Sequence, residues 1–278
     1  MLQTYDEYSN YALFPRLFYL RNMSKLAVAI IGTGNVAWHF SRIFQSEGHS
    51  LVGVFARNKE KCETFCREFQ TSKIESLSSI PSNVDLILLA VSDEAIEDVS
   101  SQIKHSALVI HTSGTTGLKA LSNERSGVVW AIHSMRKGIP SSYKQTPFII
   151  ETKNESDKAI IYQAFQSFEK NIFYANSEQR LRIHLAAVVA NNFVNHLFAI
   201  SEKLVNDSGI TFDILKPMID AHIEGIHNTS PVQLQTGPAI RSDNNTINQH
   251  LELLHSQPEL MNLYRMLTES IQKLHHKK

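Results

Sequence analysis

A glycine-containing turn that follows an apolar segment constrains the fold of this chain more than any other feature. Residues 26–31 are apolar, and the next residues read G-T-G-N-V-A, which matches the pattern G-x-G-x-x-A. The first glycine of this pattern permits a tight strand-to-helix turn, the second lets a pyrophosphate approach the backbone, and the alanine keeps the helix close to the strand. The helix N-terminus offers N–H groups and the positive end of its dipole to phosphates. A dinucleotide site is therefore predicted at Gly32, Thr33, Gly34, Asn35 and Val36.

The end of the second predicted strand indicates which dinucleotide would bind. Residues 51–56 form this apolar segment. About 20 residues after the glycines, NAD-binding proteins usually carry an Asp or Glu that binds the ribose. This chain has Arg57 and Asn58 there, with Lys59 and Lys61 following. A guanidinium can pair with a 2′-phosphate, so NADP(H) is the predicted cofactor, with Arg57 and Asn58 in its site. The alternative is that these residues are the solvated start of a helix.

Composition excludes several classes of partner and site. At 278 residues, the chain is long enough for two domains with a sizeable core. The net charge is +0 and no block of basic residues occurs, so nucleic acid is not an expected partner. Cys62 and Cys66 lie on a predicted helix without a second pair, and no H-x-x-x-H pair is present, so no metal site is predicted. Reduced thiols are consistent with a cytoplasmic protein.

Residues 1–24 are predicted to be an extension or arm outside the fold. The first 22 residues carry Asp6 and Glu7, lack a continuous apolar core and have no small-residue cleavage site, so they do not indicate a signal peptide. Met23 stands just before the first predicted strand and would be a natural start.

Strands and helices are predicted to alternate from residue 25 to residue 176. Further apolar segments typical of strands occur at 85–91, 107–111, 128–133, 147–150 and 171–175. This alternation predicts a Rossmann-type, doubly wound, mostly parallel sheet with right-handed crossovers. Ligands bind beyond the carboxyl ends of such strands, so Val91, Ser92 and Thr112 are expected in the cofactor site.

Long helical segments take over after residue 176. They are predicted at 178–206, 211–225, 246–256 and 259–273. Gly209 can end the first, Thr211 can cap the second, and Pro258 suits the start of the last. The predicted class is therefore α/β, with an NADP-binding Rossmann domain at 25–176 and an all-helical substrate or dimerisation domain at 177–278.

The first of these helices carries polar side chains on an otherwise apolar surface. Residues 181–200 are almost uniformly apolar, which predicts a helix buried on nearly all sides. Arg182, histidines and asparagines interrupt the segment, so we do not interpret it as a membrane span. His184, Asn191 and Asn195 fall within about 40° of one another around the helix. Such a stripe needs partners, either a substrate, the nicotinamide carboxamide or neighbouring helices.

A loop of fixed shape is predicted at 236–243, T-G-P-A-I-R-S-D. Asp243 could cap a helix that begins near Thr246, or pair with Arg241. Arg241 could clamp a substrate carboxylate or phosphate, or take part in a surface ion pair. A small-molecule substrate is therefore expected, with an anionic compound as one option.

Four motifs together resemble one protein family. They are G-T-G-N-V-A, H-T-S-G at 111–114, the histidine and asparagine helix at 184–195, and T-G-P-A-I-R-S-D. The family comprises Rossmann-like proteins with an all-helical C-terminal domain of unknown function, related to deazaflavin-dependent NADP oxidoreductases and pyrroline-5-carboxylate reductases. The resemblance covers residues 25–278 and implies NADP binding and a homodimer formed through the helical domain. A proline usually follows the histidine at 133 in this family, whereas this chain has Ser134.

The predicted function is that of an NADP(H)-dependent oxidoreductase, a reductase or dehydrogenase that acts on a small carbonyl, imine or hydroxyacid-type metabolite. Hydride transfer needs a proton donor, and histidine suits this role near neutral pH. The resemblance favours His184, because related hydroxyacid dehydrogenases place their donor on the first long helix after the nucleotide domain. Ser113 would hydrogen-bond the substrate and Asn191 would orient it, with His111 and His133 as rival donors.

A non-catalytic NADP(H)-binding sensor or assembly protein is the alternative. The family's usual reductase lysine is missing from the helix at 178–206, where Lys203 lies too near the far end. An enzyme would oxidise bound NADPH with some metabolite, whereas a sensor would bind the cofactor without turnover.

Overall fold

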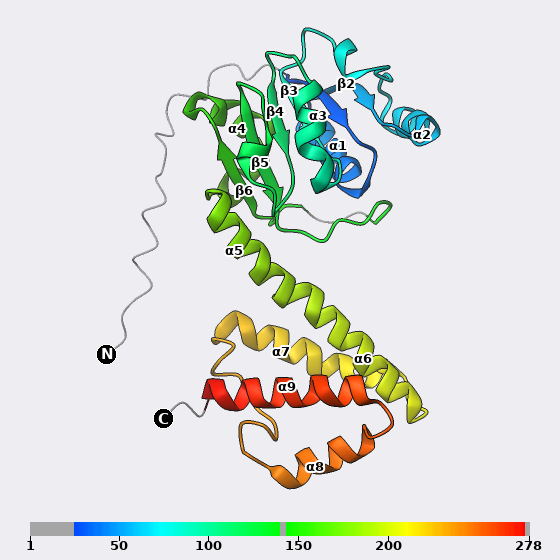
Figure 1. Ribbon diagram of the computed structural model, residues 1–278, viewed down its shortest axis with the longest axis vertical. Coiled ribbons are helices and arrows are strands. Elements are labelled where there is room, and N and C mark those ends of the chain that lie inside the picture. Colours follow the sequence, from blue (N-terminus) through cyan, green and yellow to red (C-terminus); the bar gives the residue numbers. More distant parts are fainter. Residues whose placement is uncertain (1–24, 140–142, 276–278) are drawn as a thin grey trace, which may run out of the picture. The chain divides into compact units, whose positions relative to one another are not determined.

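The computed structural model describes residues 25–139 and 143–275, which divide into two compact units (Figure 1). The first unit extends to Val194 and the second begins at Asn195. The extension expected at 1–24 lies outside the described residues.

A seven-stranded sheet, counted over the described residues, forms the centre of the first unit. Its strands are β1 (Ala27–Ile31), β2 (Ser50–Phe55), β3 (Leu86–Leu89), β4 (Leu108–His111), β5 (Ser126–Ala131), β6 (Phe148–Thr152) and β7 (Ile172–Tyr174). The spatial order is β2-β1-β3-β4-β5-β6-β7, and neighbours pair in parallel except β5 with β6. The strand order changes direction at β1, which is where ligands bind in such sheets. The predicted α/β class is confirmed.

Both faces of the sheet are covered by apolar side chains. In β1, Val28 and Ile30 join one core cluster, whereas Ala29 and Ile31 join the other. The first cluster includes side chains from α1 (Asn35–Ser46), α2 (Lys59–Phe69) and α4 (Lys158–Ala164), and the second includes side chains from α3 (Ile96–Gln102). Burial on both faces explains why the strands are continuous apolar runs in the sequence.

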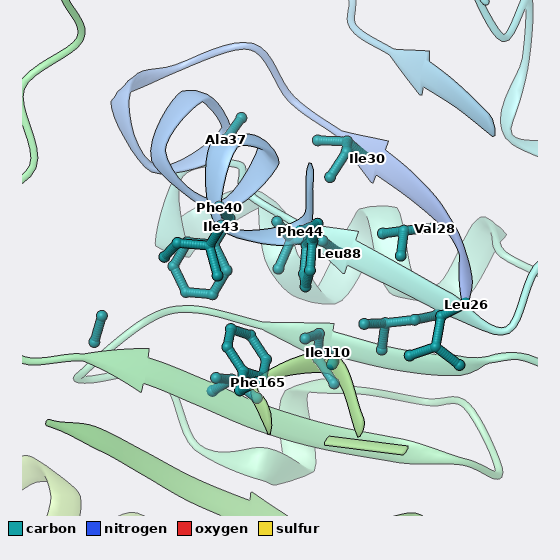
Figure 2. Close-up of a cluster of buried hydrophobic side chains, with 14 of the residues drawn as sticks. Leu26, Val28, Ile30, Ala37, Phe40, Ile43, Phe44, Leu88, Ile110 and Phe165 are labelled. Atoms are coloured by element: carbon teal, nitrogen blue, oxygen red, sulfur yellow. The ribbon is translucent and has the colours of Figure 1, made fainter. Parts of the chain in front are cut away.

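Aromatic rings fill the space between α1 and the sheet (Figure 2). Phe40 and Phe44 of α1 lie against Phe165, with ring centroids 5.9 Å and 5.5 Å from the Phe165 centroid. Phe40 also packs on Phe148 of β6, with ring centroids 6.3 Å apart, so aromatic contacts fix α1, and with it the glycine turn, on the sheet.

The strand boundaries differ in one place that affects the site. The strand expected at 128–133 runs instead from Ser126 to Ala131. His133 and Ser134 therefore belong to the segment after β5, at the carboxyl edge of the sheet.

A helical segment closes the first unit. It consists of α5 (Ser177–Ala187) and a π-helical turn at Val188–Phe193. Asn176 caps α5, because its side chain accepts a hydrogen bond from the Gln179 N–H at 2.9 Å. The Gln179 side-chain oxygen in turn accepts from the Asn176 N–H at 3.0 Å.

The second unit contains helices. They are α6 (Val194–Asp207), α7 (Lys216–Asn228), α8 (Asn244–Leu253) and α9 (Pro258–His275). Among its described residues, the buried apolar side chains are those of Ala239, Ile247 and Leu254. So small a core is unusual for a stable helical domain.

The expectation that the helix at 181–200 is buried on nearly all sides is wrong for the single chain. Leu181, Leu185, Val189 and Phe193 are 49%, 63%, 51% and 57% exposed, and their spacing of four residues makes them one apolar row. Within the described residues, the helix Ser177–Asp207 is also long and apolar enough to cross a membrane, with a mean hydropathy of 1.4. Length and composition alone do not distinguish a membrane span from a helix that another chain covers.

Candidate functional site

The glycine turn joins β1 to α1 with the geometry that its motif predicts. Gly32 has a φ of +116°, and a Cβ there would lie 2.2 Å from the Ala90 carbonyl oxygen, so a side chain does not fit. The Gly32 N–H donates to the Phe55 carbonyl oxygen at 2.8 Å, which ties the turn to the end of β2.

Gly34 and the first turn of α1 leave space and free donors for an anion. A Cβ on Gly34 would meet no atom within 4 Å. Gly34 is the N-cap residue of α1, and no side chain caps the first N–H groups of the helix. Free N–H groups beside open space suit a pyrophosphate, so the residues present fit a dinucleotide.

The end of β2 gives different roles to Arg57 and Asn58. The Asn58 side chain caps α2 by accepting a hydrogen bond from the Lys61 N–H at 2.9 Å. Arg57 is exposed directly before this cap. The guanidinium is therefore accessible to a ligand, whereas the Asn58 side chain is engaged in capping.

The hydroxyl of Ser113 is engaged by the protein itself. It donates to the Asp93 carboxylate at 2.7 Å and accepts from the N–H groups of Thr115 at 3.1 Å and Thr116 at 2.9 Å. The Thr115 hydroxyl donates to the same Asp93 oxygen at 2.6 Å. Ser113 thus holds the turn after β4, and this differs from the expectation that it hydrogen-bonds a substrate.

His111 is buried at the end of β4. Its Nδ1 accepts a hydrogen bond from the Ser113 N–H at 3.2 Å. Burial, together with the nearby Arg180 cation, lowers the pKa of His111 to about 4. The imidazole is therefore neutral at pH 7.

Two adjoining cavities lie beyond the carboxyl ends of the strands. One, the turn cavity, has a volume of about 220 Å³ and is lined by Asn35, Val36 and Thr112 together with Phe40 and Met135. The other, the helix cavity, has a volume of about 460 Å³ and is lined by Ser134, His184, Val188, Asn191 and Asn192. Trp130, Ala131 and His133 line both, so the two cavities meet at the end of β5. Of the three candidate histidines, His133 and His184 line them and His111 does not.

Gly114 makes room for the His184 ring. A Cβ on Gly114 would lie 2.4 Å from His184 Cδ2 and 2.9 Å from Trp130 Cε2. The imidazole therefore packs directly on the backbone of the H-T-S-G turn. This close packing explains why the last position of the motif, Gly114, is a glycine.

Arg180 anchors α5 one turn before His184. Its side chain is fully buried and forms an ion pair with Glu151 of β6. It also donates to the Thr116 carbonyl oxygen at 2.6 Å, and the Ser177 hydroxyl donates to Glu151 at 2.8 Å. A buried, hydrogen-bonded pair of this kind fixes the start of α5 and with it the position of His184.

The π-helical turn changes which side chains face the helix cavity. A π turn contains more residues than an α turn, so spacing based on 100° per residue fails across it. His184 and Asn191 line the cavity together with Asn192, whereas Asn195 is not among its lining residues. Asn191 Nδ2 donates to the Ser134 hydroxyl at 2.8 Å.

Several residues of the site were not predicted from the sequence. Trp130 resembled an ordinary strand residue, and Asp93 resembled a helix-start residue. The one available signal concerned Arg180, since an arginine at the start of an apolar helix needs a partner when it is buried.

The cysteines do not form part of this site. Cys62 and Cys66 are free, buried thiols of α2, and burial raises the pKa of Cys66 to about 11, with Cys62 adding to the effect. Among the described residues, no cluster of His, Cys, Asp and Glu side chains could hold a metal ion.

The 236–243 loop belongs to the second unit. Asp243 accepts hydrogen bonds from the Thr246 N–H at 3.1 Å and from the Thr246 hydroxyl at 2.8 Å. These bonds lower the pKa of Asp243. The capping role predicted for Asp243 is confirmed, and Arg241 is exposed beside it.

Two family models match the chain. Residues 27–113 match the family described as NADP oxidoreductase coenzyme F420-dependent, and residues 146–271 match Domain of unknown function (DUF2520). A comparison with curated protein sequences finds no match.

Solved structures share the fold over nearly the whole chain. A "putative NADP oxidoreductase" from Bacteroides fragilis is 28% identical, with a TM-score of 0.81 over 91% of this chain and 100% of that one. An imine reductase from Pseudomonas sp. is 16% identical, with a TM-score of 0.66 over 90% of this chain and 98% of that one. A pyrroline carboxylate reductase from Plasmodium falciparum, solved with NADP bound, is 15% identical, with a TM-score of 0.59 over 91% of this chain and 100% of that one.

These matches agree with the order of the two domains along the chain. The fold is that of NADP-binding oxidoreductases and is similar to those of pyrroline carboxylate reductases and imine reductases. The chain combines an N-terminal domain of the coenzyme F420-dependent NADP oxidoreductase family with a C-terminal DUF2520 domain.

Proposed function

We propose that this protein is an NADP(H)-dependent oxidoreductase that acts on a small carbonyl, imine or hydroxyacid-type compound. The observation that carries the proposal is the wall of Trp130, Ala131 and His133 shared by the turn cavity and the helix cavity. Asn35 and Val36 belong to both the glycine turn and the turn cavity, so a cofactor held by that turn has a cavity beside it. The helix cavity is then the place for the second reactant.

The cofactor site would be built from four strand ends, those of β1, β2, β3 and β4. The turn at Gly32 and Gly34 would hold the pyrophosphate, and Arg57 after β2 would pair with the 2′-phosphate. Val91, Ser92 and Thr112 follow β3 and β4 and complete the proposed site. When bound, NADP(H) supplies or accepts the hydride.

The residues of the helix cavity would handle the proton. In the reducing direction, His184 donates a proton to the carbonyl oxygen or imine nitrogen while the adjacent carbon gains the hydride. Asn191 would orient the substrate through its carboxamide. The Trp130 ring beside His184 restrains the imidazole and excludes water from one side of it.

Two similar proteins support a C=N substrate, because they are an imine reductase and a pyrroline carboxylate reductase. A cavity of about 460 Å³ suits a small molecule. His184 and Asn191 present a donor and an amide group rather than a fixed charge.

NADPH absorbance with a panel of cyclic imines, ketones, aldehydes and hydroxyacids, together with NADPH binding, tests the proposal. We expect turnover with at least one class, and His184→Gln to lower kcat about 100-fold or more with NADPH affinity unchanged. His196→Gln, an exposed histidine farther along the chain, is the matched control. NADPH binding without any turnover would favour the non-catalytic alternative, and full activity of His184→Gln would transfer the donor role to His133.

We also propose that a second copy of the chain covers the apolar row of Leu181, Leu185, Val189 and Phe193. The second unit leaves further apolar side chains exposed, including those of Ile214, Met218 and Met266 at 60%, 65% and 69%. Exposed apolar surface of this extent, with so few buried side chains, favours a homodimer through the helical part of the chain.

A further inference from the structure

Residues 133–137, the segment that follows β5, are attached to the first turns of α1 at two points. The Lys137 N–H donates to Asn35 Oδ1 at 3.1 Å. The Arg136 carbonyl oxygen lies 2.9 Å from His39 Nε2. The same helix turn that offers its N–H groups to an anion therefore also holds this segment.

The bond from His39 has a defined direction. A carbonyl oxygen only accepts, so Nε2 carries the hydrogen and Nδ1 accepts from the Tyr143 hydroxyl. His39 is fully buried, and burial lowers its pKa, which keeps the ring neutral with one donor and one acceptor. The attachment of Arg136 is therefore part of the folded core, whereas Asn35 is exposed.

The other end of the segment forms a wall of the helix cavity. His133 lines both cavities, and Ser134 lines the helix cavity and accepts from Asn191 Nδ2 at 2.8 Å. Residues 133–137 thus connect Asn35 of the glycine turn with Asn191 of the π-helical turn.

We propose that Asn35 is a positioning residue whose side chain transmits cofactor binding at the glycine turn to the shape of the helix cavity. The proposal rests on the NADP(H) binding proposed above. An anion bound to the first N–H groups of α1 restricts the backbone of Asn35, and its carboxamide then holds the Lys137 N–H more firmly. His133 and Ser134, a few residues before Lys137, are restricted in turn. Because coupling between sites is reciprocal, a ligand in the helix cavity would also strengthen cofactor binding.

Amide hydrogen exchange with and without NADP⁺ tests this without any need for turnover. In the wild type we expect NADP⁺ to protect both the glycine turn and residues 133–137. Asn35→Ala keeps the backbone N–H groups and places a strong helix former at an exposed helix position, so it should fold, and it is compared with the wild type at NADP⁺ concentrations that saturate each protein. In this variant, protection should reach the glycine turn alone, and exchange at Lys137 in the free protein should be about threefold to tenfold faster.

Two further variants separate the side chain's roles. Asn35→Asp keeps an acceptor for the Lys137 N–H but adds negative charge beside the phosphates. It should retain wild-type exchange at Lys137 in the free protein while weakening NADP⁺ binding. Lys137→Ala keeps the backbone donor and removes the side-chain contacts with Glu68, 3.4 Å away, and with the Phe65 ring, 5.8 Å from Nζ, so residues 133–137 should behave as in the wild type.

The outcomes distinguish the two proposals. Equal protection of residues 133–137 by NADP⁺ in the wild type and in Asn35→Ala would overturn the positioning role. An absence of NADP⁺ binding to the wild type would instead overturn the proposed function. In that case the positioning role is tested by the exchange rate at Lys137 in the free wild type and in free Asn35→Ala. Equal rates in the two proteins would overturn the positioning role as well.

Discussion

The imidazole of His184 lies against the indole of Trp130, with ring centroids 5.4 Å apart and ring planes inclined by 50°. The histidine comes from α5 and the tryptophan from β5. Because Trp130 lines both cavities, the contact places His184 beside a residue that the two cavities share. The ring also rests on Gly114, so its position depends on a residue without a side chain.

Replacing Gly114 by alanine should displace this ring. The added Cβ would lie 2.4 Å from His184 Cδ2, so the Gly114→Ala variant should lose about 1–3 kcal/mol of unfolding free energy and much of its turnover. Gly117→Ala is the control, because its Cβ would meet Ser177 Oγ at an ordinary 3.5 Å. Urea denaturation and NADPH oxidation measure the two effects. Equal stability of the two variants would show that the His184 ring adjusts freely.

Removing the guanidinium of Arg57 should affect one cofactor and not the other. Arg57→Ala is expected to raise the Kd for NADPH roughly tenfold and to leave the Kd for NADH unchanged, because only NADPH carries the 2′-phosphate. The effect should shrink at high salt, since Arg57 is exposed. Arg67→Ala, at the exposed last turn of α2, is the control. Calorimetric titration is the measurement, and wild-type NADH binding as tight as that of NADPH would refute the cofactor preference.

Acid should destabilise the fold through His111. Its pKa is about 4 in the folded protein and 6.5 for an unperturbed histidine, so between these values the unfolded chain binds a proton that the folded chain does not. The free energy of unfolding should therefore fall by about 3 kcal/mol as the pH is lowered from 7 to 4.

His111→Gln should reduce this pH dependence, because a glutamine can accept from the Ser113 N–H without titrating. Buried His39 contributes in the same direction, so some dependence should remain. Urea denaturation at several pH values measures the slope. The exposed His255→Gln variant should keep the wild-type slope, and an unchanged slope in His111→Gln would contradict the assignment.

A charge in the apolar row should dissociate the proposed dimer. Leu185 is 63% exposed in the single chain, so Leu185→Lys should leave the fold intact and convert dimer to monomer. Arg182→Glu, a charge change outside the row, should not. Light scattering after size exclusion measures the mass. A wild type that is monomeric, or that stays in solution only with detergent, would argue against a second copy as the partner.

The glycine turn and the sheet could be predicted from the sequence because both depend on local patterns. The positive φ at Gly32 and the strands β1, β3 and β4 follow from residue types that stand next to one another in the sequence. The end of β5 was less certain, because nothing in the apolar run at 128–133 indicates where pairing with β6 stops.

The details of the site could not be predicted because they depend on contacts between distant segments. Ser113 was expected to hydrogen-bond a substrate, but its hydroxyl donates instead to the carboxylate of Asp93, which follows the neighbouring strand. The stripe of His184, Asn191 and Asn195 assumed one helical period, and the π-helical turn breaks that period. Exposure of Leu185 depends on what covers α5, which a single sequence does not contain.

Substitutions at the two glycines of the turn should impair the protein for different reasons, and the difference matters for the interpretation of genetic data. A side chain at Gly32 would collide with the Ala90 carbonyl oxygen, so such an allele should lower the abundance of the protein in the cell. A side chain at Gly34 would meet only open space, so that allele should produce normal amounts of a protein that is blocked at its ligand site. Both alleles would score as loss of function in a growth assay, and an immunoblot would tell them apart.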